Sequence, residues 1–158
     1  GLGDVYKRHV LWDVKLSSKR NYATWDISHE KFHENQYDSA LVLNVTRNIY
    51  GEVVTFIKEN NLPIGRIINC TPSGVGATNF SVEDGTHATA LANSVYNAIG
   101  RRSTVERRAT LHIFAAAPNA FMFFLGQNSV GFGKCILYEY DFEQRNSCTY
   151  SQSMSFIN

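Results

Sequence analysis

Short apolar runs alternate with stretches of helical periodicity along most of the chain. Residues 40–46 form a strand-like run, and Ile49, Val53, Phe56 and Ile57 follow it at helical spacing. The same reasoning predicts further strands at residues 10–15, 64–70, 109–114, 135–140 and 149–156, and further helices at residues 88–100 and 118–126. The pattern therefore predicts strands and helices that follow one another in turn.

This order of elements indicates the fold class. Parallel strands need crossover connections, which are usually helices, so the alternation favours a parallel arrangement. We predict an α/β fold of Rossmann-like layout: a mostly parallel sheet with helices on both faces and a half-exposed C-terminal edge strand at residues 149–156. Sheets of this class bind ligands beyond the carboxyl ends of their strands. The segments expected to border a ligand are residues 46–50, 71–78, 115–119 and 138–142.

Length and composition are those of one ordinary globular domain. The chain has 158 residues, of which 44% are hydrophobic and 18% charged. A chain of about 150 residues buries about 68–70% of the surface that its unfolded form exposes, so it needs no disulfide or metal to fold. The formal net charge of +1 argues against a protein that coats DNA, because that binding depends on clustered cations. We expect any nucleotide ligand to be small and held in a pocket.

Cysteine content and hydropathy bear on location. Cys70, Cys135 and Cys148 are an odd number at wide spacings, which fits a reducing compartment, so a cytoplasmic location is expected. The longest strongly apolar run, residues 113–125, is shorter than the about 20 residues that span a bilayer, and no membrane span is predicted. The chain begins at Gly1, which suggests an excised fragment or the remnant of a tag.

Small and polar residues follow the predicted strands and form the candidate site. Arg47 offers a guanidinium suited to bidentate phosphate contact. Pro118 opens a helix whose first N–H groups attract anions. Each segment alone is typical of an ordinary turn, but several of them meet at one edge of the sheet. The candidate ligand-binding residues are Thr46, Arg47, Thr71, Pro72, Ser73, Gly74, Ala116, Ala117, Pro118, Asn119, Tyr138 and Glu139.

The segment Tyr138-Glu139-Tyr140 allows two interpretations. A tyrosine ring can stack on a base, and a carboxylate can accept hydrogen bonds from the exocyclic amines of bases. The alternative is an aromatic strand end that packs under a neighbouring loop. The sequence leaves both open.

Two motifs resemble known sites but lack part of the required pattern. Gly74-x-Gly76 is not followed by the third glycine of a dinucleotide fingerprint, because Asn79 stands at that position. His29 and His33 fit H-E-x-x-H, which needs a stable helix to present both imidazoles to zinc. Their flanks offer little apolar surface to bury such a helix, so we predict neither a metal site nor a bound cofactor.

Catalytic cysteine and histidine chemistry has weak support. Cys70 ends a predicted strand and His87 opens a predicted helix, so a nucleophilic pair is conceivable. A small core cysteine and a surface histidine at a helix end are the more common arrangement. His112 alternates with apolar neighbours and is expected to be buried and hydrogen-bonded.

Two further segments suggest surfaces. Residues 101–108 form a basic cluster between a helix and a strand. We expect this cluster to be a solvated face at the end of the sheet opposite the site. Contact with an acidic partner or nucleic acid is the alternative.

The helix at residues 118–125 is apolar all round. We expect its outer face to pack on a second domain or a neighbouring subunit, with a central core helix as the alternative.

Several short motifs, in order, carry a family resemblance. They are Leu111-His112-Ile113-Phe114-Ala115-Ala116-Ala117-Pro118-Asn119-Ala120, Leu125-Gly126, Ile136-Leu137-Tyr138-Glu139-Tyr140 and Tyr150-Ser151. Together they resemble the closing half of the SAVED domain, over roughly residues 40–157. Residues 9–25 resemble the segment that joins the two halves. The resemblance divides the chain into a connecting segment, residues 1–38, and a CARF-like unit, residues 39–158.

The resemblance implies a function. SAVED domains consist of two CARF-like units and sense cyclic oligonucleotides in bacterial CBASS antiphage defence. It implies that the chain is a sensor and not an enzyme, and that it binds a cyclic di- or trinucleotide. It also implies a linked nuclease, protease or TIR effector and association into a homo-oligomer on ligand binding. The alternative is a Rossmann-like enzyme that processes nucleotides, for example one that cleaves the messenger.

Overall fold

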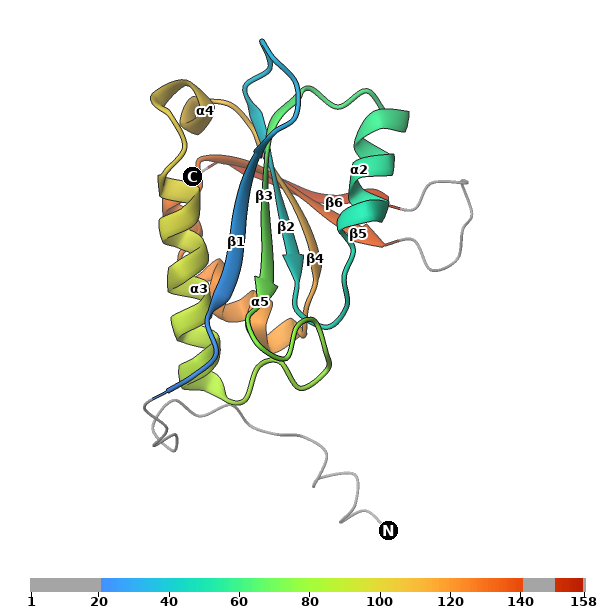
Figure 1. The fold of residues 1–158 in the computed structure, drawn as a ribbon. Coiled ribbons are helices and arrows are strands. Elements are labelled where there is room, and N and C mark those ends of the chain that lie inside the picture. Colours follow the sequence, from blue (N-terminus) through green and yellow to red (C-terminus); the bar gives the residue numbers. More distant parts are fainter. Residues whose placement is uncertain (1–20, 141–149, 158) are drawn as a thin grey trace.

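The computed structural model describes residues 21–140 and 150–157 (Figure 1). The strand predicted at residues 10–15 and Cys148 lie outside this part of the chain. The elements in order are β1 (Trp25–Lys31), β2 (Asp38–Asn44), α2 (Tyr50–Glu59), β3 (Ile64–Pro72), α3 (Gly85–Gly100), α4 (Thr104–Arg108), β4 (Leu111–Ala116), α5 (Asn119–Gly126), the 3-10 turn η2 (Ser129–Gly131), β5 (Lys134–Tyr140) and β6 (Tyr150–Ile157).

The strands form one mixed sheet in the order β1-β3-β2-β4-β5-β6. The four central strands run parallel, and both edge strands pair antiparallel to their neighbours. The prediction of an α/β fold is confirmed. The prediction of a mostly parallel sheet holds for the four central strands but not for the two edge strands. The strand β1 was not predicted, because its sequence, WDISHEK, lacks an apolar run. It belongs to the sheet, although the resemblance placed residues 1–38 in a connecting segment.

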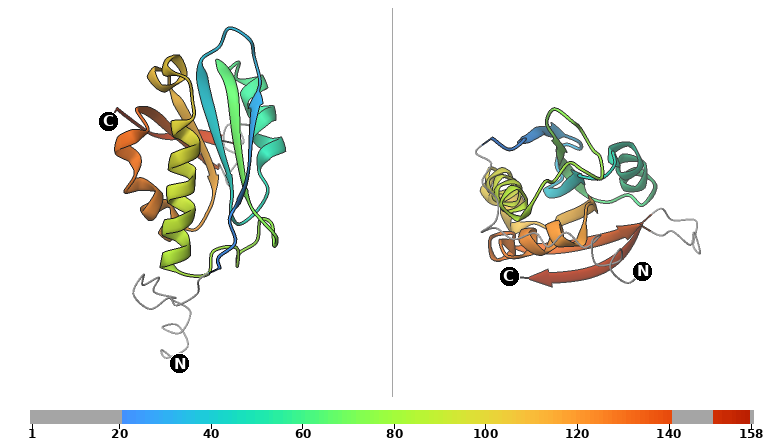
Figure 2. Two further views of the ribbon diagram at one scale, coloured as in Figure 1. Left: turned by 60° about the vertical axis from the view of Figure 1, so that its left-hand side comes forward. Right: turned by 90° about the horizontal axis from the view of Figure 1, so that it is seen from below.

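Helices cover both faces of the sheet, as predicted (Figure 2). Successive residues of a strand point to opposite faces. Leu41 and Leu43 of β2 therefore pack under α3 and α5, whereas Ala40 and Val42 pack under α2. All four side chains are fully buried. The central strand thus belongs to two apolar layers at once.

The basic cluster at residues 101–108 is only partly solvated. Residues 104–108 form the short helix α4, which a capping box of Ser103 and Glu106 begins. Arg102 is 3% exposed, and its guanidinium donates to the carbonyl oxygens of Ile99 and Phe132 at 3.0 and 3.1 Å. The prediction of a solvated face is wrong for Arg102 and Glu106, because both bond to backbone or to the sheet. Figure 1 shows α4 at the end of the sheet opposite α5.

The structure also bears on the motifs that the sequence left aside. His29 lies in β1 and His33 in the turn after it, so the helix that H-E-x-x-H requires is not formed. His87 is fully buried and bonds to the carbonyl oxygen of Ala23 at 2.7 Å, so its prediction as a surface residue is wrong. Burial raises the pKa of the Cys70 thiol to about 12, which keeps it protonated.

The helix α5 has one face in the core and one outside it. Phe121 and Leu125 are buried against the sheet, whereas Phe123 is 65% exposed. The interpretation as a central core helix is therefore wrong, and packing on a second domain or subunit stays a prediction. Within residues 21–140 and 150–157, no helix combines the length and apolar character needed to cross a membrane.

Candidate ligand site at the carboxyl end of the sheet

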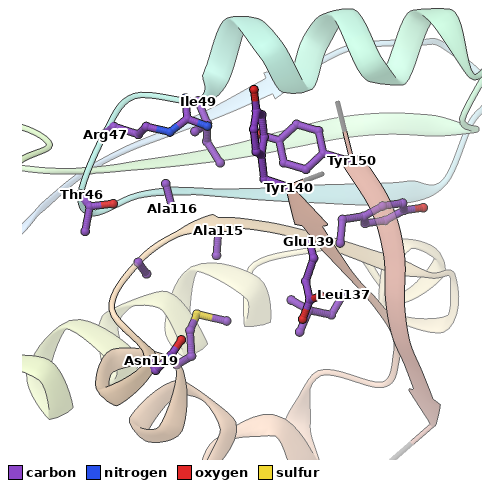
Figure 3. Close-up of a pocket in the computed structure, with 13 residues that line it drawn as sticks. Thr46, Arg47, Ile49, Ala115, Ala116, Asn119, Leu137, Glu139, Tyr140 and Tyr150 are labelled. Atoms are coloured by element: carbon purple, nitrogen blue, oxygen red, sulfur yellow. The ribbon is translucent and has the colours of Figure 1, made fainter. Parts of the chain in front are cut away.

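A pocket of about 480 Å³ lies at the carboxyl ends of β2, β4 and β5, where the fold class predicts a ligand (Figure 3). The strand ends form its floor, and the loop after β2 and the start of α5 form its walls. The residues that line it are Thr46, Arg47, Ile49, Ala115, Ala116, Ala117, Asn119, Met122, Leu137, Tyr138, Glu139, Tyr140 and Tyr150.

The buried side chain of Asn44 fixes the loop after β2. Its Oδ1 accepts from the backbone N–H of Ile49 at 2.8 Å, which closes the turn that carries Thr46 and Arg47. Its Nδ2 lies 2.7 Å from Oδ1 of Asn69 and 3.0 Å from Oγ1 of Thr71, both on β3. A buried amide that meets partners on both sides holds two elements in register. The wall that carries Arg47 is therefore anchored to the sheet.

The end of β4 holds the same loop from the other side. The carbonyl oxygen of Ala116 accepts from the backbone N–H groups of Val45 and Thr46, at 2.9 and 2.8 Å. Ala115, Ala116 and Ala117 are only half-buried and carry no more than a methyl group. This combination leaves the pocket floor open, because larger side chains in these positions would fill it.

The start of α5 forms the wall opposite Arg47. Pro118 is the N-cap residue, and its carbonyl oxygen accepts from the N–H of Met122 at 3.2 Å. The first N–H groups of a helix have no partner within it and favour anions. Asn119, the first helical residue, is exposed and lines the pocket. Pro118 therefore sets the direction of this wall without lining the pocket itself.

Arg47 is the cation among the lining residues in the described part of the chain. Its Nη1 and Nη2 donate to Oε1 and Oε2 of Glu52, at 2.6 and 3.2 Å. Its Cζ lies 5.0 Å from the centre of the Tyr140 ring, a distance typical of cation–π contact. Figure 3 shows Arg47 pointing toward Tyr140, with Asn119 across the pocket.

For Tyr138 the structure supports the interpretation that its ring packs inside the protein. Its ring is 7% exposed and stacks on Phe114 with centroids 4.4 Å apart. Its hydroxyl lies 2.9 Å from Nδ1 of His112, whose Nε2 lies 2.9 Å from Oδ2 of Asp38. Burial raises the pKa of Tyr138. The ring therefore packs in the core between the sheet and α2, and the prediction that His112 is buried and hydrogen-bonded is confirmed.

Thr71, Pro72, Ser73 and Gly74 lie outside this pocket. Thr71 and Pro72 end β3 and pair with the edge strand β1, and Ser73 and Gly74 follow in the loop after β3. The Oγ of Ser73 donates to the carbonyl oxygen of Thr24 at 2.9 Å, and Thr71 accepts from Asn44. The sequence pattern groups all strand ends together, whereas in the sheet β3 lies on the side of β2 that faces away from β4, β5 and the pocket.

Some pocket residues were not among the candidates. Met122 lies three residues after Asn119, so helical spacing could have shown that both share a face. Tyr140 belongs to the segment whose rings could stack on a base, but it is not among the candidate residues. Tyr150 starts β6, and only its pairing with Tyr140 across the sheet brings it to the site. Glu52, the partner of Arg47, gives no signal beyond its place in the first turn of α2.

The family described as "SMODS-associated and fused to various effectors sensor domain" matches residues 3–156. The chain belongs to the SAVED family. The matched residues include the pocket, every helix described above and the sheet up to Phe156.

A relative and a solved structure extend this result. "CD-NTase-associated protein 4" of Enterobacter hormaechei subsp. hoffmannii (strain UCI 50) is 41% identical over 116 residues, which are 73% of this chain and 23% of that protein. The Cap4 SAVED/CARF-domain containing receptor of Acinetobacter baumannii, solved with the cyclic trinucleotide 3'3'3'-cAAA, matches with a TM-score of 0.68 at 14% identity. The match covers 89% of this chain and 29% of the receptor chain. The SAVED chain described here spans about a quarter of the length of its relative.

Proposed function

We propose that this SAVED chain binds a cyclic oligonucleotide in the pocket at the carboxyl ends of β2, β4 and β5. The observation that carries the proposal is the pocket itself. It places the guanidinium of Arg47 opposite the first N–H groups of α5, over a floor of alanines. The receptor of like fold holds 3'3'3'-cAAA, which supports a ligand of that class.

The chemistry of the walls suits phosphates and bases. Arg47 can donate two parallel hydrogen bonds to a phosphate, and α5 can donate backbone N–H groups to another. Tyr140 is half-buried at the rim, where its face is suited to stacking. Glu139 is exposed and lines the pocket, so its carboxylate can accept from the exocyclic amine of a base.

The relatives support a proposal about the wider role. We propose that residues 39–158 form the CARF-like unit of a longer cytoplasmic sensor in bacterial antiphage (CBASS) defence, linked to a nuclease, protease or TIR effector, and that β1 adds an edge strand to this unit. In this scheme the ligand favours association of the sensor by binding the assembled state more tightly. The length of the relative, of which this chain spans 23%, supports further domains in proteins of this kind.

Calorimetry on the 158-residue chain tests the proposal. Titration with a panel of cyclic di- and trinucleotides, 3'3'3'-cAAA among them, should give heat of binding, and chromatography should recover the ligand unchanged. Linear products would instead indicate a nucleotide-processing enzyme.

Ala116→Leu, which fills the floor, should weaken binding at least about tenfold, because a clash with a bound ligand costs more than 1.4 kcal/mol. Ala90→Leu, on the exposed face of α3, is the matched control.

A further inference from the structure

The cation of the pocket is already engaged by a carboxylate of its own chain. Glu52 stands in the first turn of α2, five residues after Arg47. The two terminal nitrogens of Arg47 donate to the two carboxylate oxygens of Glu52, at 2.6 and 3.2 Å. This is the parallel, two-bond geometry in which a guanidinium also binds a phosphate. Glu52 therefore stands where a phosphate oxygen pair would approach Arg47 end-on.

Two tyrosines complete the surroundings of this pair. The ring of Tyr140 lies under the guanidinium, with Cζ 5.0 Å from its centre. The hydroxyl of Tyr150, on β6, donates to Oε2 of Glu52 at 3.5 Å. The hydrogen bond from Arg47 to Glu52 raises the pKa of Arg47, so the guanidinium is charged throughout the neutral range. The carboxylate cancels that charge at the mouth of the pocket.

The Arg47–Glu52 pair is held in place but is not buried. Side-chain exposure is 45% for Arg47 and 38% for Glu52. Ion pairs exposed to this degree are weak, because water and salt screen both charges. A ligand that carries several phosphates can therefore displace the carboxylate, but it does so against a local negative charge.

We propose that Glu52 is an internal competitor for the ligand: its carboxylate occupies Arg47 in the ligand-free chain, and a ligand phosphate displaces it. The proposal rests on the proposed function, since it requires an anionic ligand in this pocket. It assigns Glu52 a role in setting affinity, although Glu52 does not line the pocket. A weaker resting affinity raises the ligand concentration at which the sensor responds.

Glu52→Gln tests the proposal by calorimetry with 3'3'3'-cAAA and the other members of the panel. Glutamine keeps the size of the side chain and removes its charge. We expect the variant to bind about two- to fivefold more tightly than the wild-type chain, which corresponds to the loss of one exposed ion pair. Glu59→Gln, the same charge change at the exposed other end of α2, should leave the Kd unchanged. A circular dichroism melt checks that both variants fold.

The double variant Arg47→Ala/Glu52→Gln separates competition from simple charge repulsion. Arg47→Ala alone should weaken binding, and adding Glu52→Gln to it should give no gain, because the contested guanidinium is gone. The proposal is overturned if Glu52→Gln binds equally or more weakly, or if its gain persists without Arg47. If the wild-type chain binds no member of the panel, the proposed function fails and this proposal fails with it.

Discussion

Asn44 ties the loop that carries Arg47 to the sheet. It is fully buried at the end of β2, and its amide bonds reach the loop after β2 and the end of β3. A buried polar side chain of this kind is favourable only when its partners are satisfied. The position of Arg47 thus depends on a residue that does not touch the pocket.

Asn44→Ala should destabilise the chain by about 2–4 kcal/mol, because it leaves the N–H of Ile49 and the polar groups of β3 without their partner. Urea unfolding followed by circular dichroism measures the change. Asn97→Ala, at an exposed position of α3, should cost less than about 0.5 kcal/mol. Equal losses for the two variants would contradict the role assigned to Asn44.

At the scale of elements, α4 shows how a short helix is held on the sheet. Five residues form too few internal hydrogen bonds to be stable alone. Glu106 bonds to Nε of Arg66 on β3 at 2.5 Å and to the N–H of Ser103 at 2.6 Å. Burial would raise the pKa of Glu106, but these hydrogen bonds outweigh it and lower the pKa.

A lowered pKa in the folded state links this helix to pH. The ionised form of Glu106 contributes stability above its unfolded pKa of about 4.5, and this contribution is lost as pH falls through the lower, folded pKa. Glu106→Gln should therefore be less stable than wild type at pH 7, and the difference should shrink below about pH 4.5. Urea unfolding between pH 7 and pH 3 measures it. A difference that is constant across this range would rule out the linkage.

For the whole molecule, the sheet joins two apolar layers. Val53 of α2 and Val95 of α3 are both fully buried, on opposite faces. Strand β2 contributes to both layers, so neither layer can open without disturbing the other. We expect the described part of the chain to unfold as a single cooperative unit.

The variants Val53→Ala and Val95→Ala test whether the two apolar layers unfold together. Each should destabilise the chain by about 1–3 kcal/mol through lost packing. Both should shift one common transition in urea, seen alike by far-ultraviolet circular dichroism and by the fluorescence of Trp25 in a Trp12→Phe background. Two separate transitions in either variant would show that the layers unfold independently.

The sequence predicted those features that local pattern determines. Apolar periodicity placed α2, α3 and α5 within a few residues, and the carboxyl-end rule brought Arg47 and Asn119 to one pocket. It did not predict β1, whose polar side chains reflect an edge position. Nor did it separate Ser73 from the pocket, because strand order depends on pairing between distant segments. The burial of Tyr138 depended on the same pairing.

The pocket floor rests on three strands that are bonded side by side, β2, β4 and β5. Neighbouring strands lie about 4.8 Å apart, so the outer two stand roughly 10 Å from each other. The width of the pocket floor is fixed, because a wider spacing would break the hydrogen bonds between the strands. Under the proposed function, discrimination between larger and smaller cyclic ligands must therefore come from the pocket walls, where side chains and loops can change without altering the width of the floor.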